Sequence, residues 1–371
     1  MAKAFGIVSS SGSHIHVEGM QDYRPIGSFS FLGRYRMIDF PVSNLSNSDI
    51  DRIQVYIQQN PRSLAEHLGT GRHYNINSKR GKLQLLFTED SRINEIYNTD
   101  MAGYAAHLDI IERMRQEYVV IVPSHMVFKQ NFDELLETHI ESKADITMLY
   151  HKVNDADKSY RSCTIMKLNR QRGLKCLARN DNTSADENIF MDTYVMKRDI
   201  FVKLIKKAMS LSSVYTLADM VNSEADSYDI RGVAHKGYFA AITDIKSYHE
   251  ANLELLDIDL TDELFTPDWP FYTKTTDSCP VHYFEGCKVK NSMVANGSLI
   301  EGTIENCVIG RNVAVGKGAV LKNCVVLAQA VIGEDVHIEN QVIDKWANIT
   351  NVKKIVAEAD KPGYIRRNDV L

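Results

Sequence analysis

Along the first 255 residues, short apolar runs alternate with longer segments whose apolar positions recur every three to four residues. Short apolar runs predict buried strands, and the longer period predicts amphipathic helices. Such alternation is typical of an α/β domain, in which helices pack on a central sheet. The predicted strands span residues 5–8, 52–57, 118–122, 144–150, 164–168 and 192–196. The predicted helices span residues 41–48, 63–69, 101–115, 132–142, 198–208 and 245–255.

The pattern changes after Val281, where apolar residues stand six positions apart with one step of five. This hexapeptide period indicates a parallel β-helix, in which each hexad supplies one short strand of a coil. We expect the five-residue step, from Leu327 to Ile332, to be a tightened corner. Antiparallel hairpins are the alternative, but they do not require a constant register. The first register contains Ile309, Val315, Leu321, Leu327, Ile332 and Ile338, and the second contains Val313, Ala319, Val325, Val331, Val336 and Val342.

These patterns predict two domains, and 371 residues are enough for two separate cores. The segment between them is rich in Asp, Thr and Pro and includes Pro267-Asp268-Trp269-Pro270, which indicates an ordered linker. We therefore divide the chain into an α/β domain at 1–255, a linker at 256–280 and a β-helix at 281–371.

Composition narrows the classes of function. The formal charge is −5, from 43 Lys and Arg against 48 Asp and Glu, which argues against nucleic acid as the main partner. No apolar stretch is long enough to span a bilayer, and the first residues do not resemble a signal peptide. The six cysteines form no Cys-x-x-Cys pair. We expect a cytoplasmic protein with reduced cysteines and no membrane contact.

The first predicted strand runs into a turn of small residues, as at a nucleotide-binding loop. Such a loop needs glycine where backbone N–H groups approach phosphate closely, yet serines occupy most of this turn. The turn alone leaves open whether the chain binds a nucleotide, turns one over or does neither. Its residues are Ser9, Ser10, Ser11, Gly12, Ser13 and His14.

A longer block makes a family visible. Residues 31–44, Phe-Leu-Gly-Arg-Tyr-Arg-Met-Ile-Asp-Phe-Pro-Val-Ser-Asn, resemble the P-F-G-G-K-Y-R-I-I-D-F-x-L-S-N block of bacterial ADP-glucose pyrophosphorylases (glucose-1-phosphate adenylyltransferases). Residues 248–253 and 268–270 are similar to the family's Y-W-x-A-N-L and N-W-P. The resemblance covers nearly the whole chain. It implies a Rossmann-like nucleotidyltransferase domain followed by a left-handed parallel β-helix, in a tetramer that makes ADP-glucose from ATP and glucose 1-phosphate for glycogen synthesis.

The positions that hold metal in this family are changed here. The family binds Mg²⁺ through the aspartates of a G-D-H block and a W-R-D-V-G-T block, which align with His125 and Ala241. Mg²⁺ prefers hard oxygen ligands and neutralises the charge that develops during nucleotidyl transfer. We therefore expect this chain to bind no metal or other cofactor, with Mg²⁺ used by a catalytic partner.

The phosphate-binding positions are changed as well. The arginine of the family loop G-G-x-G-S-R-L aligns with His14, and the lysine of its R-A-K-P block with Ile26. On the sugar-phosphate side, the lysine of E-K-P aligns with Arg179 and the glycine of S-M-G with Asp192.

The resemblance also implies a regulatory anion site between the domains. Arg24 and Arg36 align with positions that bind effector anions in the family, and Arg34 lies beside them. The alternative is that these arginines are ordinary solvated charges.

We interpret the combined losses as those of a pseudoenzyme, most similar to the non-catalytic branch of the family. It is predicted to assemble with a catalytic subunit as a heterotetramer and to modulate it, and self-association as a homodimer is a further expectation. One alternative is an active glucose-1-phosphate adenylyltransferase with an unusual site. Another is a free-standing effector-binding or scaffold protein.

Overall fold

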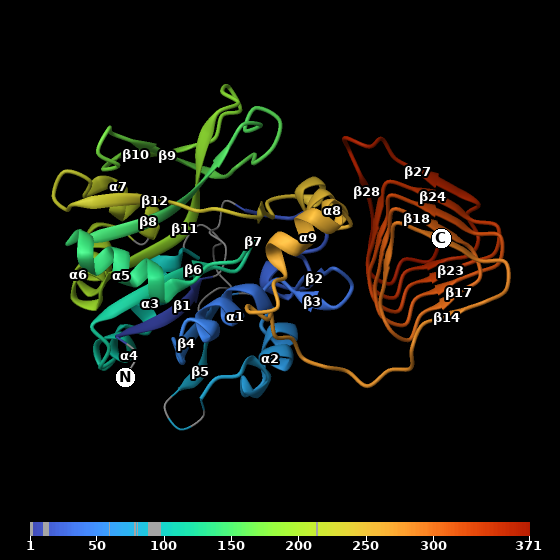
Figure 1. Cartoon of the computed structure of the whole chain (residues 1–371), viewed down its shortest axis with the longest axis horizontal. Coiled ribbons are helices and arrows are strands. Elements are labelled where there is room, and N and C mark those ends of the chain that lie inside the picture. Colours follow the sequence, from blue (N-terminus) through green and yellow to red (C-terminus); the bar gives the residue numbers. More distant parts are fainter. Residues whose placement is uncertain are drawn as a thin grey trace.

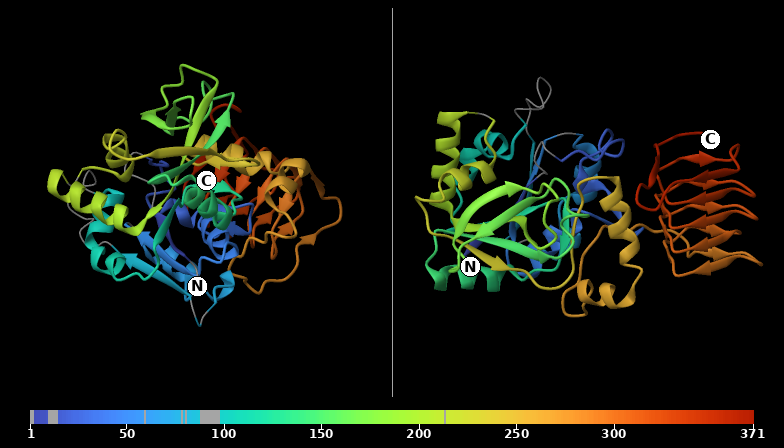
Figure 2. Two further views of the ribbon diagram at one scale, coloured as in Figure 1. Left: turned by 60° about the vertical axis from the view of Figure 1, so that its left-hand side comes forward. Right: turned by 90° about the horizontal axis from the view of Figure 1, so that it is seen from above.

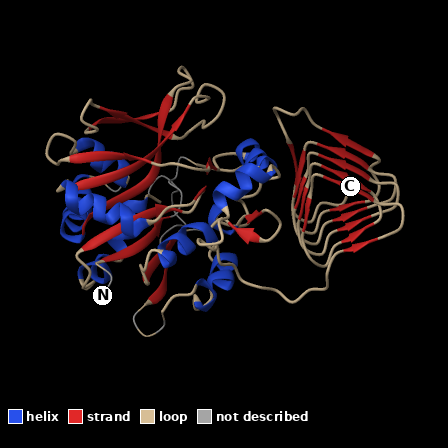
Figure 3. Cartoon of the chain, viewed as in Figure 1, coloured by secondary structure: helices blue, strands red, loops and turns tan. Residues whose placement is uncertain are grey.

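The computed structural model describes residues 3–9, 15–58, 60–77, 79, 81–87, 98–212 and 214–371. It confirms the predicted class, because an α/β domain is followed by a stack of short parallel strands (Figure 1). Figure 3 shows that the described helices lie before the β-helix in the chain and that the β-helix consists of strands and loops. No helix in these ranges is long and apolar enough to cross a membrane.

The α/β domain is built on a nine-stranded mixed sheet, with the order β10-β9-β11-β6-β1-β4-β5 and with β8 and β12 added beside β11. The strands β6, β1, β4 and β5 run parallel, and β11 runs antiparallel to β6 and β8. The strands are β1 (Ala4–Ser9), β4 (Arg52–Ile57), β5 (Lys82–Phe87), β6 (Tyr118–Pro123), β8 (Ile146–Val153), β9 (Thr164–Leu168), β10 (Leu174–Arg179), β11 (Glu187–Lys197) and β12 (Ile230–Ala234).

Helices cover both faces of this sheet, because successive strand residues point to opposite sides. In β1, Val8 contributes to one buried cluster with α1, α2 and α5, whereas Phe5 and Ile7 contribute to another with α3, α4, α6 and α7. The helices are α1 (Asp39–Asn47), α2 (Arg62–Leu68), α3 (Asp100–Ala106), α4 (Leu108–Glu112), α5 (Phe132–Ser142), α6 (Arg198–Leu211) and α7 (Leu217–Ser223), with 3-10 turns η1 (Ile26–Ser28) and η2 (Arg72–Tyr74).

Each predicted strand and helix of the first domain corresponds to an observed element, with one division. The predicted helix at 101–115 is two helices, α3 and α4, separated at His107, whose φ of −118° is not helical. The strands β5, β10 and β12 and the helix α7 were not predicted. The first three carry mixed polar and apolar residues, so their pattern is weaker than that of the buried central strands.

A small structural unit connects the α/β domain to the β-helix. It contains the hairpin of β2 (Ser30–Phe31) and β3 (Tyr35–Arg36), the antiparallel pair β7 (Met126–Phe128) and β13 (Phe239–Ala241), and the helices α8 (Ile245–Glu254) and α9 (Ile258–Leu264). Helix α9 therefore lies inside the segment 256–280. After it, the Phe271 ring packs 4.9 Å from that of Phe40, so this segment has its own hydrophobic contacts with the first domain.

The β-helix is a prism of three parallel five-stranded sheets (Figure 2), consistent with the predicted left-handed form. Later coils repeat every 17 residues, as in the pairing of Ile304 with Leu321 and of Leu321 with Ile338. The first sheet contains β14 (His282–Tyr283), β17 (Leu299–Ile300), β20 (Ala314–Val315), β23 (Val331–Ile332) and β26 (Asn348–Ile349). The second contains β15 (Lys288–Lys290), β18 (Thr303–Glu305), β21 (Val320–Lys322), β24 (His337–Glu339) and β27 (Lys354–Val356). The third contains β16 (Met293–Val294), β19 (Val308–Ile309), β22 (Val325–Val326), β25 (Gln341–Ile343) and β28 (Gly363–Ile365).

One part of the predicted β-helix register is wrong. The five-residue step runs from Leu321 to Val326, and Val326 faces the interior. Leu327 and Val325 lie on either side of it and face outward, where the first domain buries them. Side chains alternate along a strand, so a covered outer face makes both neighbours apolar and hides the true interior position. Val331 was also assigned to the interior, but it is 41% exposed.

An asparagine ladder follows one corner of the prism. The amide of Asn306 donates to Asn323 at 2.7 Å, and that of Asn323 donates to Asn340 at 3.1 Å. All three residues have positive φ, which asparagine tolerates better than most residues. The ladder therefore fixes this corner in each coil by its backbone conformation and its side-chain hydrogen bonds.

Candidate functional site

The two positions that align with the family's metal ligands come together at the β7–β13 pair. Ala241 pairs with Met126, and the backbone N–H of Ile242 donates to the carbonyl of His125 at 2.9 Å. Both His125 and Ala241 are buried, at 1% and 5% exposure. The fold thus places the two positions predicted to correspond to metal ligands close together, although neither carries a carboxylate.

The carboxylate of Asp192 faces the imidazole of His125. Its Oδ2 lies 3.5 Å from Nε2 of His125, at an irregularity of β11 between Phe190 and Tyr194. Asp192 has a φ of 44°, in the left-handed region that favours glycine, and the family motif quoted above has glycine there. Burial and then the nearby Asp100 carboxylate together raise the pKa of Asp192 to about 7.

These donors do not fit Mg²⁺. The ion needs several hard oxygen ligands, whereas the two aligned positions offer an imidazole and a methyl group. The raised pKa of Asp192 means that its carboxyl favours the neutral form more than usual, which weakens it as a ligand. Within the described ranges, no group of three or more His, Cys, Asp or Glu side chains could hold a metal ion.

Of the serine-filled turn, the structure describes Ser9, which is the last residue of β1. The Ser9 carbonyl accepts from the backbone N–H of Ser124 at 3.0 Å, which brings the start of the turn beside the segment that carries His125. Ser10, Ser11, Gly12, Ser13 and His14 lie outside the described residues. Ile26 is 1% exposed and belongs to a hydrophobic core, so this position provides packing and no cation.

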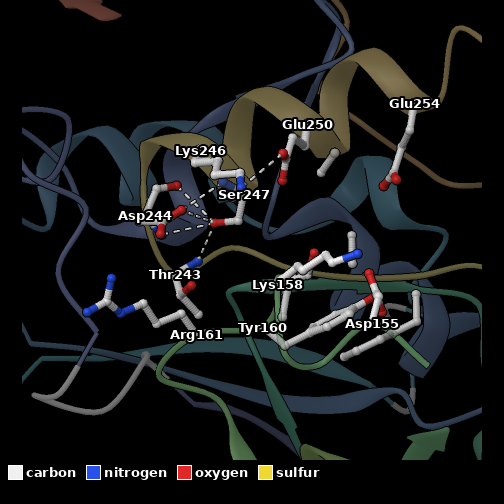
Figure 4. A pocket seen from close by; sticks show the side chains of 15 residues that line it. Asp155, Lys158, Tyr160, Arg161, Thr243, Asp244, Lys246, Ser247, Glu250 and Glu254 are labelled. Carbon is white, nitrogen blue, oxygen red and sulfur yellow. Dashed lines mark hydrogen bonds and ion pairs between the residues drawn. The ribbon is translucent and has the colours of Figure 1, made fainter. Parts of the chain in front are cut away.

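Ala241 also lines a cavity of about 110 Å³ between α8 and the segment 155–161 (Figure 4). Helix α8 begins next to it, with Asp244 as its N-cap in a capping box with Ser247. Glu250 and Glu254 extend from α8 toward Tyr160 on the opposite side of the cavity. The turn that ends β13 therefore fixes the orientation of the helix that forms one wall.

Burial and mutual repulsion govern the acidic wall of this cavity. Burial raises the pKa of Glu250 and of Glu254, and the carboxylate of Asp155 adds to both increases. The Tyr160 ring stacks on that of Phe239 at 5.8 Å and 7°, which gives the opposite wall a flat aromatic surface. Sequence analysis missed these residues, since an acidic pair four residues apart on a helix is indistinguishable from a solvated helix face.

Arg179 lies away from this cavity. It ends β10, and its guanidinium donates to the Ser162 hydroxyl at 3.2 Å in a separate polar cavity of about 520 Å³. The predicted sugar-phosphate residues Arg179 and Asp192 therefore do not line one common pocket among those that the structure describes.

Two arginines of the predicted anion site, Arg24 and Arg36, lie near Lys345 at the domain junction. Arg24 is 3% exposed and pairs with Asp344, and Arg36 donates to the Ser63 carbonyl at 2.6 Å. Arg34 stacks on the Tyr35 ring instead. Sequence analysis missed Asp344, although an Asp-Lys pair directly after the buried strand β25 interrupts the apolar pattern and was a usable signal.

Comparison with known proteins finds a family match for each of the two domains. The nucleotidyl transferase family matches residues 24–257, and the GlmU-like C-terminal hexapeptide family matches residues 282–366. The chain is 29% identical over 364 residues to the glycogen biosynthesis protein GlgD of Bacillus subtilis, covering 98% of this chain and 95% of that protein. It is 30% identical to GlgD of Geobacillus stearothermophilus over 86% and 83% of the two chains. It is 25% identical to a glucose-1-phosphate adenylyltransferase of Fervidobacterium nodosum over 92% and 83%.

Proposed function

Because the chain belongs to the nucleotidyl transferase family and is similar to glycogen biosynthesis proteins over nearly its whole length, we propose that it is a modulatory subunit without catalytic activity. Its partner in this proposal is a catalytic ADP-glucose pyrophosphorylase subunit in the cytoplasm, within a heterotetramer. The partner supplies the glycine-rich loop, both aspartates and the Mg²⁺ that they hold.

One observation carries the proposal. The backbone brings His125, directly before β7, close to Ala241 of β13 in a buried site, but neither side chain offers a hard oxygen to a metal. Each 1.4 kcal/mol of lost transition-state stabilisation lowers a rate about tenfold, so removal of both metal ligands leaves little turnover. The described strands and helices around this site form a continuous mixed sheet with helices on both faces, which supports a role for the fold in assembly.

A subunit without chemistry of its own acts only by favouring one state of its partner. The thermodynamic requirement is that it contacts the active and inactive states of the catalytic subunit with different free energies. The same linkage makes the assembly tighter under conditions that favour the preferred state. This reciprocity gives a readout that does not depend on catalysis by this chain.

The decisive experiment compares three preparations in an assay of pyrophosphate release from ATP and glucose 1-phosphate. They are this chain alone, the catalytic homologue from the same genome alone, and the two co-expressed. We expect no turnover from this chain, a stable complex on co-purification, and a changed kcat or KM of the complex relative to the homologue. Robust turnover by this chain alone would favour the active-enzyme alternative. Failure to form a complex, with unchanged kinetics of the homologue, would contradict the modulatory role.

A further inference from the structure

The junction between the two domains contains a buried carboxylate that groups of the same chain hold completely. Nη2 of Arg24 lies 2.6 Å from Oδ1 and 2.7 Å from Oδ2 of Asp344, which is fully buried. The Tyr364 hydroxyl donates to Oδ2 at 2.7 Å, and the backbone N–H of Lys345 donates to Oδ1 at 2.6 Å. These donors use most of the lone-pair positions that a carboxylate offers.

The surroundings of this carboxylate are cationic. Three arginines lie close enough to Lys345 to act on its charge, and we call Arg24, Arg36, Lys345 and Arg367 the cation cluster. Burial and then the charges of the three arginines lower the pKa of Lys345 to about 7. Among the described residues, Asp344 is the carboxylate that opposes this effect. Concentrated guanidinium and ammonium groups are the chemistry by which proteins hold phosphate and other oxyanions.

The cation cluster has unused hydrogen-bonding capacity. Nε of Arg24 and Nε of Arg367 are buried and have no hydrogen-bond partner among the described residues. A buried guanidinium without an anion is strongly unfavourable, so Arg24 needs either an internal carboxylate or a bound anion. The structure shows that the internal carboxylate meets this need.

We propose that Asp344 is a resident anion, whose carboxylate occupies from within the chain the place that the cation cluster would otherwise offer to a phosphate group. The junction between the domains is thereby held in one arrangement without any ligand. Arg24 precedes Pro25, the N-cap of the turn η1 in the first domain, and Asp344 directly follows β25 of the β-helix, so the ion pair connects the two domains. This inference concerns the isolated chain and does not depend on the proposed partner.

The test replaces Asp344→Asn and measures binding of inorganic phosphate to the full-length chain by calorimetry at constant ionic strength. We expect the variant to bind phosphate at least tenfold more tightly than the parent chain, because the cation cluster then lacks its anion. Phosphate should also raise the melting temperature of the variant by several degrees more than that of the parent chain. Asp335→Asn, at an exposed corner of the same β-helix, is the matched control and should leave phosphate binding unchanged.

Two results would overturn the proposal. One is a variant that folds but binds phosphate no better than the parent chain. The other is a parent chain that already binds phosphate at the cation cluster as tightly as the variant, tested by loss of binding in Arg24→Gln. If Asp344→Asn folds only when phosphate is present, that dependence supports the proposal.

Tyr364→Phe covers the case in which Asp344→Asn does not fold under any condition. This substitution removes one donor from Asp344 and keeps both charges of the ion pair. We expect a gain of a few-fold in phosphate affinity, since the carboxylate is then held less firmly in place. If Tyr364→Phe gains no phosphate affinity, the proposal is contradicted as directly as by an Asp344→Asn variant that folds but gains none.

Discussion

Nε2 of His125 lies 3.5 Å from Oδ2 of Asp192, and this contact joins two positions that belong to different motifs in the sequence. His125 follows β6, the neighbour of β1 in the sheet, and Asp192 lies at the irregularity of β11. An imidazole and a carboxyl of raised pKa thus face each other near the β7–β13 pair.

We expect the stability contribution of Asp192 to depend on pH. Burial raises its pKa from 3.8 to about 7, so the folded state holds the proton more tightly than the unfolded state. This contribution is complete below about pH 4 and is lost as pH rises through about 7. A pKa increase of this size corresponds to about 4 kcal/mol in the free energy of unfolding for a fully buried group. The partial exposure of Asp192 reduces this contribution to roughly 2 kcal/mol.

Asp192→Asn should therefore raise the free energy of unfolding relative to the parent chain by more at pH 8 than at pH 4. Urea denaturation at both pH values measures this difference. Asp186→Asn, at an exposed position, is the control and should show the same small effect at both pH values. An Asp192→Asn effect that does not change with pH would contradict the assignment.

Restoring the two aspartates alone should not restore catalysis. The double substitution His125→Asp and Ala241→Asp places two carboxylates at the β7–β13 pair, but the loop still carries Ser9, Ser10 and His14. Loss of phosphate-binding groups costs further orders of magnitude in rate, so we expect under roughly 1% of the turnover of a catalytic homologue. Pyrophosphate release measures this outcome.

The informative comparison adds Ser9→Gly, Ser10→Gly and His14→Arg to the two aspartates. We expect this variant with five substitutions to have measurably more activity than the double variant. Full activity from the aspartates alone would show that the loop retains its ability to bind the triphosphate.

Two valines on successive strands of the β-helix should differ strongly in their response to the same substitution. Val325 is 1% exposed and packs against the first domain, whereas Val331 is 41% exposed. Val325→Asp buries an unpaired charge and should lower the free energy of unfolding by about 3 kcal/mol or more. Val331→Asp should change it by less than about 0.5 kcal/mol. Chemical denaturation checks both values, and equal effects would mean that the outward face of β22 is not covered.

The asparagine ladder separates a conformational effect from a hydrogen-bonding effect. Asn323 has a φ of 49°, and its side chain bonds to both Asn306 and Asn340. Asn323→Gly keeps the left-handed conformation but removes the side-chain bonds, which should cost about 1–2 kcal/mol. Asn323→Ala adds the strain of a β-carbon at positive φ, a further 1 kcal/mol or so.

Thermal and urea denaturation of these two variants should therefore rank glycine above alanine in stability. The usual order in regular structure is the reverse, because glycine has the more flexible unfolded chain. If alanine were the more stable, backbone conformation would not be what selects asparagine at this corner.

The sequence by itself determined the local structure. The central strands β1, β4 and β6 and the helix α5 follow directly from apolar period, because packing on a sheet requires that period. The six-residue spacing of apolar positions likewise predicted the β-helix, because each coil must bury one apolar residue per short strand. Motif alignment also selected His125 and Ala241, and the fold places them close together at the β7–β13 pair.

Only the tertiary structure decided which apolar positions face the interior and which charges are paired. Val325 and Leu327 resemble interior residues because a separate domain covers them, and no local pattern distinguishes the two kinds of burial. Asp344 reaches Arg24 across 320 residues, and Asp192 reaches His125 from another strand. Such contacts depend on how distant segments converge in space, and charge pairing over that separation leaves no period in a single sequence.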